Sequence, residues 1–329
     1  MAPSIFTAFH YVSKVQIHLV ALPYVGWLSE ILFCTIYSCL RAWSGSFVAG
    51  DLKACSRPTG KLVLYEFEAC PFCRKVREAL SVLDLDVDVR PCPRETLKAY
   101  GVCKDSRFRT EVRDRGGKQQ FPYFIDEGLD VTLQSSDAIV EHLWKHYGAK
   151  ASKPLTYTLG LRLNRPPLFF LPALTRTLMH HGMLRIPSKA PRQPLELWSF
   201  EGSPFCRVVR EALCCLELPY KLHNVAHGAT SKRAAFREAH LSKLSVGRRA
   251  LDGVVQVPFL IDPNTGAELL ESKDILAYLH ATYKAGECPD ETWADYSTAG
   301  ASVSHGTLSS GLMTGPSTPN PSAASKKWS

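Results

Sequence analysis

The chain lacks three features that would assign a protein to a familiar class. Its 11 cysteines do not have the dense, regular spacing of a secreted disulfide scaffold, which favours a reducing compartment. Its net charge of +8 comes from dispersed basic residues without interleaved aromatic residues, so nothing indicates a nucleic-acid partner. The apolar stretch from residue 15 to residue 40 contains Gln16, His18, Pro23 and Glu30, and is therefore a poor candidate for a membrane span.

Acidic residues are scarce at the start of the chain. Glu30 and Asp51 are the only acids before residue 60, and residues 1–58 belong to neither of the repeated units described below. This composition favours an N-terminal leader that targets the protein to an organelle; the alternative is an ordered helix that packs on the first domain. The last segment, 286–329, is rich in Ser, Thr, Gly, Ala and Pro, which predicts a disordered tail.

Residues 149–194 contain no acidic residue, although basic and large apolar residues are frequent there. A segment of this kind could lie on an anionic membrane surface. We favour a basic, apolar linker whose apolar side docks between two domains, so that any membrane contact is peripheral and confined to this segment.

The most informative residues present are Cys70-Pro71-Phe72-Cys73. They follow a run with strand character at 61–67 and open a run with helix character at 74–80. A Cys-x-x-Cys between a strand and a helix is the redox placement of the thioredoxin-like fold. The N–H groups and partial positive charge at a helix start favour a thiolate over a thiol. Cys70 is therefore the candidate nucleophile and Cys73 the candidate resolving residue.

The same pattern occurs again 133 residues further on. The run 195–200 leads into Ser203-Pro204-Phe205-Cys206, and the helix after it repeats the i, i+3, i+4, i+7 spacing of one buried face. Later, residues 120–126 are matched by 256–262. Two matched half-chains indicate a duplicated α/β domain. The predicted domains are residues 61–148 and 195–285.

The hydrophobic periodicity also predicts the individual elements. In the first copy we expect strands at 62–67, 87–90, 123–126 and 131–134, helices at 73–83 and 136–147, and one helix in a loop-rich middle. In the second copy we expect strands at 195–200, 220–225, 259–262 and 267–270, and helices at 206–216, 230–241 and 272–283.

Each copy has a proline directly before a predicted strand. Pro122 and Pro258 occupy the place that a cis-proline takes in the thioredoxin-like fold, opposite the redox helix. An ordinary strand-initial proline is the alternative, and it is less plausible for both copies than for one. Ser136 and Ser272 stand at a helix start, where N–H groups bind a carboxylate or where a serine simply caps the helix.

Together these motifs resemble the N-terminal domain of glutathione S-transferases, which is close kin to glutaredoxin. More narrowly, the chain is similar to plant and algal proteins that carry two such domains in tandem and are usually directed to plastids. The resemblance covers roughly residues 61–285 and implies an α/β fold of two tandem thioredoxin-like (GST N-terminal/glutaredoxin-like) domains. It also implies a plastid location, with the cytoplasm as the alternative. The motifs that carry it are Cys70-Pro71-Phe72-Cys73, Gly116-Gly117-Lys118-Gln119-Gln120-Phe121-Pro122-Tyr123 and Glu201-Gly202-Ser203-Pro204-Phe205-Cys206.

The resemblance further implies that glutathione is the ligand of the first copy. Cys70 would face the glutathione sulfur, and the backbone of Phe121, before Pro122, would pair with the cysteinyl part. Ser136 and Asp137 would hold the γ-glutamyl end. The first copy departs from the family at Ser135, where an acidic or amide residue is usual.

In the second copy, Ser203 stands where the nucleophile would be. A serine can donate a hydrogen bond to a glutathione thiolate but cannot form a mixed disulfide. The residues that correspond to the binding residues of the first copy are Val257, Pro258, Glu271 and Ser272, while Lys273 replaces the expected Asp. We therefore expect the second copy to bind glutathione weakly or to serve as a structural partner.

A metal site is an alternative use for these cysteines. Cys70, Cys73, Cys92 and Cys103 could be offered as ligands, but they lack the second Cys-x-x-Cys of a zinc ribbon. The second copy has no counterpart of Cys92 or Cys103, so we predict no metal, whether zinc or an iron–sulfur cluster.

A complete glutathione transferase continues with an all-helical domain, for which neither the linker nor the tail is a convincing candidate. The leading hypothesis is therefore a glutathione-dependent thiol–disulfide oxidoreductase acting through Cys70 on glutathionylated or disulfide-bonded proteins. The alternative is a non-catalytic glutathione-binding or protein-interaction module, and a conjugating transferase is the third and weakest option.

Overall fold

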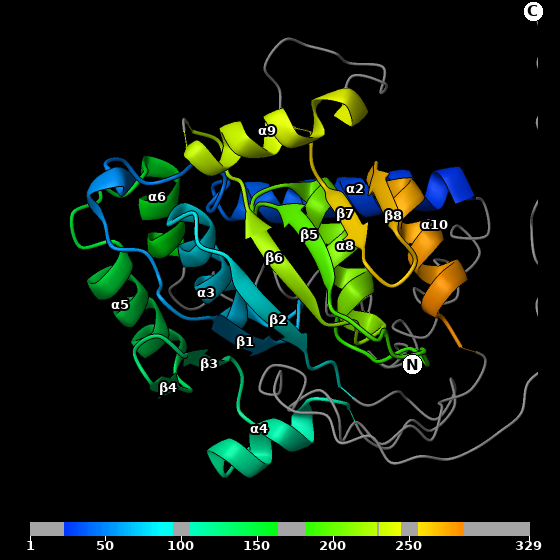
Figure 1. The fold of residues 1–329 in the computed structure, drawn as a ribbon, viewed down its shortest axis with the longest axis horizontal. Helices are drawn as coiled ribbons and strands as arrows, with labels where there is room; N and C mark the ends of the chain where they lie inside the picture. Colours follow the sequence, from blue (N-terminus) through cyan, green and yellow to red (C-terminus); the bar gives the residue numbers. More distant parts are fainter. Residues whose placement is uncertain (1–22, 95–105, 164–181, 229, 245–255, 286–329) are drawn as a thin grey trace, which may run out of the picture. The chain divides into compact units, whose positions relative to one another are not determined.

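The computed structural model describes residues 23–94, 106–163, 182–228, 230–244 and 256–285 (Figure 1), all of which belong to one unit of the chain. Residues 1–22 of the predicted leader, Cys103, and the tail predicted to be disordered at 286–329 lie outside the described residues.

The strands of both copies form a single eight-stranded sheet in the order β4-β3-β1-β2-β6-β5-β7-β8. Within each half the first two strands are parallel and the last two are antiparallel, so the halves repeat one topology. The strands are β1 (Leu62–Glu66), β2 (Val87–Pro91), β3 (Tyr123–Asp126), β4 (Val131–Leu133), β5 (Leu195–Ser199), β6 (Tyr220–Asn224), β7 (Phe259–Asp262) and β8 (Ala267–Leu270).

The two halves are joined by the antiparallel pair β2–β6, in which Asp88 lies opposite Lys221. On either side, Val87 pairs with Leu222 and Val89 pairs with Tyr220. Because the repeat offset is 133 residues, exchanging the two copies reproduces these same pairs. The halves are therefore related by an approximate two-fold axis through the Asp88–Lys221 pair, which the sequence did not predict.

Helices cover both faces of the sheet. The alternation of side chains along a strand sends Leu62 and Leu64 to one face and Val63 and Tyr65 to the other. The first face carries α3 (Pro71–Val82), α5 (Ser136–Tyr147), α8 (Pro204–Cys215) and α10 (Ser272–Tyr283), whose apolar residues share one core cluster with strands of both copies. The second face carries α4 (Arg109–Gly116) and α9 (Ser231–Leu244), which contribute Val112 and Phe236 to two smaller clusters.

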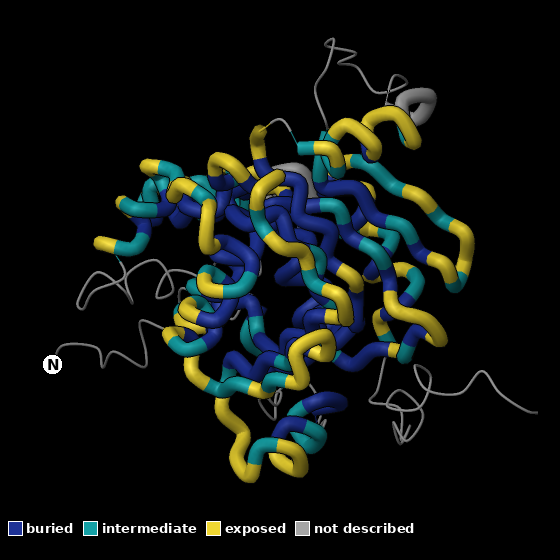
Figure 2. The backbone as a smooth tube through the Cα atoms, turned by 60° about the vertical axis from the view of Figure 1, so that its left-hand side comes forward, coloured by how far each residue is buried: buried dark blue, intermediate teal, exposed yellow. Residues whose placement is uncertain are grey.

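Burial follows this layered arrangement. Figure 2 shows the inner strands and the helices against them as buried over most of their length, with exposure concentrated at turns and outer helix faces. Since the main cluster contains Leu64 and Leu80 from the first copy and Leu197 and Leu213 from the second, the two copies share one hydrophobic core.

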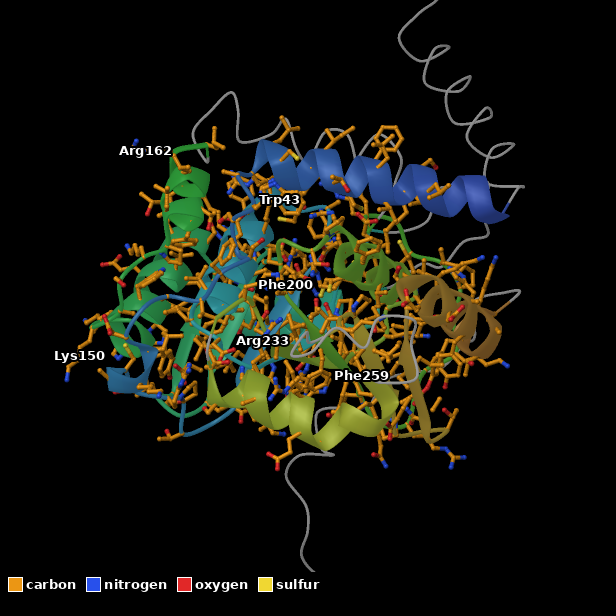
Figure 3. All side chains as sticks on the ribbon, turned by 90° about the horizontal axis from the view of Figure 1, so that it is seen from above. Trp43, Lys150, Arg162, Phe200, Arg233 and Phe259 are labelled. Atoms are coloured by element: carbon orange, nitrogen blue, oxygen red, sulfur yellow. The ribbon has the colours of Figure 1, made fainter. Side chains whose placement is uncertain are left out.

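The part of the predicted leader that the structure describes is ordered. Helix α2 (Pro23–Leu40) contacts α8, and Figure 3 shows it on the side of the sheet opposite α9. Directly after it, Arg41 forms a two-pronged ion pair with Glu78 of α3, with Nη2–Oε distances of 2.9 and 2.8 Å. This agrees with the ordered-helix alternative for residues 23–40, although α2 lies on a helix of the second copy. The targeting role of residues 1–58 stays a prediction.

The described parts of the linker pack on both copies; on the first, Trp144 of α5 donates a hydrogen bond to the Tyr157 hydroxyl at 3.0 Å. They include helix α6 (Leu155–Leu163), where the Gly160 carbonyl accepts a hydrogen bond from Arg41 Nη1 at 3.0 Å. At the other end, Arg185 pairs with Glu217 at 2.5 Å. These contacts favour the docked linker over the membrane surface. Among the described residues, no helix has the length and apolar character needed to cross a bilayer.

The predicted strands and helices are confirmed, with shifts at their ends. The redox helix and its counterpart begin at Pro71 and Pro204 rather than at Cys73 and Cys206, because a proline fits the first helical turn, where its missing N–H has no intrahelical partner. The helix in the loop-rich middle of the first copy is α4.

Candidate functional site

The predicted site residues of the first copy gather where β1 ends. Pairing of Tyr65 with Tyr123 places the residues after β1 and before β3 at the same edge of the sheet. The rings of Phe67 and Phe121 meet there edge to face, with centroids 6.1 Å apart. The Phe121–Pro122 peptide bond is cis, as predicted, and so is Val257–Pro258 in the second copy.

Cys70 is the N-cap residue of α3, with an extended backbone. Its sulfur accepts a hydrogen bond from the backbone N–H of Cys73, with an N–Sγ distance of 3.4 Å. Burial disfavours the thiolate, but hydrogen bonds from the Cys73 side chain and from the N–H groups of Cys73 and Phe72 hold the pKa of the Cys70 thiol below its ordinary value. Cys70 is therefore the better nucleophile of the pair.

Cys73 lies one turn further into the helix and is completely buried. Burial raises the pKa of its thiol well above the ordinary value, and its hydrogen bond to Cys70 acts in the same direction. Both residues are free thiols. The opposite directions of the two pKa shifts match an attacking thiol and a resolving thiol.

A cation that the sequence did not single out lies against Phe121. The Arg109 guanidinium stands 4.7 Å from the Phe121 ring centroid and 5.8 Å from that of Phe67. It is held by the carbonyls of Cys92 and Pro93, at 2.9 and 2.7 Å. The signal in the sequence was weak, because Arg109 stands in the loop-rich middle without a counterpart motif in the second copy.

Ser136 and Asp137 begin α5, whose start lies beside the redox helix. The Asp137 carboxylate bonds Lys75 of α3 at 2.7 Å, which joins the first turns of the two helices. Asp137 is exposed and Ser136 is buried. The interpretation of Ser136 as the helix cap is wrong, because the N-cap residue is Ser135, whose side chain makes no capping hydrogen bond. Ser136 is the first helical residue instead.

The second copy repeats this geometry without the nucleophile. Ser203 is the N-cap residue of α8, and its hydroxyl oxygen accepts a hydrogen bond from the Cys206 N–H at 3.2 Å. Cys206, like Cys73, is completely buried. Trp198 pairs with Phe259, so Val257 and Pro258 lie at the same edge of the sheet as the end of β5.

At the start of α10, Glu271 is the N-cap residue and Ser272 is the buried first helical residue. The same correction therefore applies to Ser272 as to Ser136. The Glu271 carboxylate accepts a hydrogen bond from the Gln256 side chain at 2.5 Å, which links it to the segment before Pro258.

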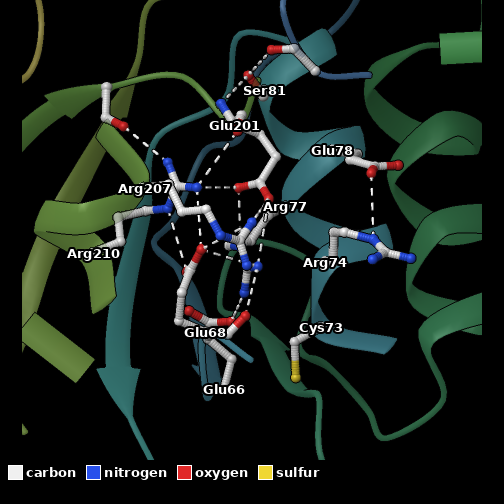
Figure 4. Close-up of polar contacts among 12 residues, drawn as sticks. Glu66, Glu68, Cys73, Arg74, Arg77, Glu78, Ser81, Glu201, Arg207 and Arg210 are labelled. Atoms are coloured by element: carbon white, nitrogen blue, oxygen red, sulfur yellow. Dashed lines mark hydrogen bonds and ion pairs between the residues drawn. The ribbon is translucent and has the colours of Figure 1, made fainter. Parts of the chain in front are cut away.

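A buried network of charged side chains connects the two copies behind these helix starts (Figure 4). We call it the arginine–glutamate cluster, and all its members are at most 7 % exposed. The arginines and glutamates are equal in number, so their charges balance when all are ionised. The members are Arg41, Arg74, Arg77, Arg207, Arg210, Glu66, Glu68, Glu78, Glu201 and Glu211.

The centre of this cluster follows the two-fold symmetry. Arg77 contacts Glu68 of its own copy at 3.4 Å and Glu201 of the other at 3.0 Å. Its counterpart Arg210 contacts Glu201 at 2.9 Å and Glu68 at 3.2 Å. Each arginine therefore bridges the copies. Sequence analysis missed the cluster, although Arg74, Arg77 and Glu78 recur as Arg207, Arg210 and Glu211 at the repeat offset.

Of the four cysteines considered as metal ligands, Cys103 lies outside the described residues. Cys92 is buried, and burial raises the pKa of its thiol well above the ordinary value. Within the described ranges, no three His, Cys, Asp or Glu side chains are grouped to hold a metal ion.

One family model matches the chain, and it does so twice. The model for the glutathione S-transferase N-terminal domain matches residues 64–151 and residues 197–287. No curated protein and no solved structure matches the chain. The two matched regions coincide with the two halves of the sheet and leave the segments before, between and after them unmatched.

Proposed function

Because the chain belongs to the glutathione S-transferase N-terminal domain family, we propose that it is a glutathione-dependent thiol–disulfide oxidoreductase acting through Cys70. The observation that carries the proposal is the arrangement at the start of α3. There the Cys70 sulfur accepts the Cys73 N–H at 3.4 Å, its pKa is lowered, and a second thiol lies directly behind it. Only a thiolate attacks a disulfide, so this arrangement serves exchange.

In the proposed reaction, the Cys70 thiolate attacks the glutathione sulfur of a glutathionylated protein. The sulfur–sulfur bond breaks, the protein thiolate leaves and takes up a proton, and Cys70 becomes joined to glutathione. A glutathione thiolate then attacks the glutathione sulfur of this mixed disulfide, which releases glutathione disulfide and restores the Cys70 thiolate. In the other route, Cys73 loses its proton and attacks the Cys70 sulfur, which releases glutathione and leaves a Cys70–Cys73 disulfide.

Glutathione is proposed as the ligand on the same basis. The backbone of Phe121, Ser136 and Asp137 would bind it, and Arg109 adds a positive charge beside Phe121. The second copy, with Ser203 in place of the nucleophile, contributes structure or a weaker binding site. A plastid location, with the cytoplasm as the alternative, also stays a proposal.

One observation favours a second candidate, the non-catalytic module. Cys70 is only 4 % exposed, so its sulfur presents little surface to a protein disulfide. Conjugation is the weakest option, since the described residues contain no separate all-helical domain.

The test is turnover of a glutathionylated peptide by the full chain, compared with Cys70→Ser, Cys73→Ser and Ser203→Ala. We expect Cys70→Ser to abolish turnover because a hydroxyl is a far weaker nucleophile near neutral pH. Cys73→Ser should retain much of the rate if glutathione resolves the intermediate, and Ser203→Ala serves as the matched control in the second copy. Equal rates in the wild type and Cys70→Ser would leave the non-catalytic module as the better description.

A further inference from the structure

The arginine–glutamate cluster plays no part in the proposed reaction, yet it lies directly behind the reactive thiols. Arg77 follows Cys73 by four residues, so the two side chains lie one helical turn apart on the same side of α3. Arg77 pairs with Glu66, the last residue of β1, as well as with Glu68 and Glu201. The Glu201 carboxylate of the second copy is therefore linked to the redox helix of the first copy through the Arg77 side chain.

Comparison of the two copies shows which members are tied to the thiol. At the repeat offset, Glu68, Arg74, Arg77 and Glu78 recur as Glu201, Arg207, Arg210 and Glu211. Glu66 does not recur, since its counterpart is Ser199, which accepts a hydrogen bond from Arg210 at 3.2 Å. The copy that lacks the nucleophile also lacks this carboxyl group. Among the symmetric members, the pairs Arg77–Glu201 and Arg210–Glu68 join the copies, whereas Glu66 accompanies Cys70.

We propose that the second copy takes part in the chemistry of the first, with Glu201 as a positioning residue that fixes Arg77 and through it the charge of Glu66 beside the thiols of Cys70 and Cys73. The proposal rests on the proposed function only in that these thiols are the reactive ones. Arg77 cannot neutralise Glu66 fully while Glu201 and Glu68 share its guanidinium. Glu201 thereby sets the electrostatic potential in which Cys70 ionises.

The pKa values of Glu66 and Glu201 agree with the different roles proposed for them. Burial raises the pKa of Glu66 to about 7, even though Arg77 contacts it. Burial also tends to raise the pKa of Glu201, but the positive charges of Arg210, Arg77 and Arg207 outweigh it and hold this pKa at about 2. Glu201 thus keeps its negative charge at every pH of interest. The charged and titratable groups that interact with Glu66 come from both copies. They are the N-cap Cys70, Cys73 and Arg77 of α3, the loop residues Glu68, Cys92 and Glu201, Arg210 and Cys214 of α8, and Tyr220 of β6.

The test is the pH dependence of Cys70 alkylation by iodoacetamide in the full chain, read by peptide mass spectrometry. This reaction needs no glutathione, so it reports on the inference even if turnover of a glutathionylated peptide fails. Glu201→Gln removes one of the negative charges that share the Arg77 guanidinium with Glu66. We expect the midpoint of Cys70 labelling to move to lower pH by roughly half a unit or more.

Glu211→Gln is the matched control, because Glu211 is also buried in the same copy and its carboxylate pairs with Arg207 of its own helix at 3.2 Å. It should lower thermal stability while leaving the labelling midpoint in place. An unchanged midpoint in Glu201→Gln, or equal shifts in both variants, overturns the proposal. If Glu201→Gln does not fold, Glu201→Asp takes its place. Its shorter side chain weakens the Arg77 contact, so we expect a smaller shift in the same direction, and no shift overturns the proposal.

Discussion

The ion pair between Arg41 and Glu78 offers the sharpest test of how the N-terminal segment belongs to the fold. Both side chains are at most 2 % exposed, and the pair is two-pronged, with a further bond from Arg41 to the Gly160 carbonyl. Arg41→Met would leave the Glu78 carboxylate buried. Its remaining cation is Arg74, whose Nε lies 3.6 Å away.

The expected cost follows from these contacts. Removing one partner of a buried pair destabilises by about 3–5 kcal/mol, because the other charge is left uncompensated. Since Arg74 compensates Glu78 in part, we expect a loss of about 3 kcal/mol in the free energy of unfolding, measured by urea denaturation. One cooperative transition is expected, because both copies contribute to one core cluster.

Two further variants make this result interpretable. Arg57→Met is the matched control, because the Arg57 side chain is 43 % exposed and the buried Asp84 carboxylate, 3.8 Å away, would keep Lys232 at 3.3 Å, so its loss should cost about 1 kcal/mol. The double variant Arg41→Met/Glu78→Met should recover only part of the loss, since it removes the buried carboxylate but also takes from the buried Arg74 the carboxylate that lies 3.6 Å from its Nε. If Arg41→Met costs no more than Arg57→Met, Arg41 does not anchor the segment and the reasoning fails.

Two other predictions follow from the structure. Tyr283→Phe should cost about 1–2 kcal/mol at neutral pH, because the Tyr283 hydroxyl donates to the buried Asp262 carboxylate at 2.5 Å. Burial opposes the charge, but bonds from Tyr283, Tyr278 and Asn264 hold the pKa of Asp262 below its ordinary value, so this stabilisation is present above about pH 4 and is lost as pH falls through the lower, folded-state pKa. The cost of Tyr283→Phe in urea denaturation should therefore shrink near pH 3, and an equal cost at both pH values would contradict it. Deleting residues 1–58 should lower the midpoint of thermal unfolding, because it removes α2, Arg41 and the buried Leu52; an unchanged midpoint would support a removable leader.

Local patterns in the sequence were enough to predict most elements of the fold. The strands and helices depend on apolar periodicity, and the starts of α3 and α8 depend on Cys70-Pro71 and Ser203-Pro204, which are adjacent residues. The prolines before β3 and β7 were recognised because each copy supplied a check on the other. The cap position was wrong by one residue, since either Ser135 or Ser136 suits a helix start equally well.

The contacts that join the two copies could not be predicted from local patterns in the sequence. The β2–β6 pairing brings Asp88 to Lys221, and strand pairing between distant segments carries no periodic signal. A charged residue in a helix is normally on a solvated face, so no local pattern indicates that Arg77 and Arg210 are buried. The repetition of the Arg and Glu positions between the copies was the one available sign, and it becomes informative only once both helices are known to lie on the same face of one sheet.

The same contacts explain why a second copy without a nucleophile would be retained. Without it, Arg77 would lose Glu201, and the edge of β2 would expose the backbone groups that now pair with β6. The apolar residues of α3 and α8 would also be separated, although they belong to one cluster. Replacing Cys70 by Ser203 at the symmetric position disturbs none of these contacts, because the hydroxyl keeps the hydrogen bond from the fourth residue of the motif. The reactive residue can therefore vary between the copies while the cluster and the strand pairing hold both in place.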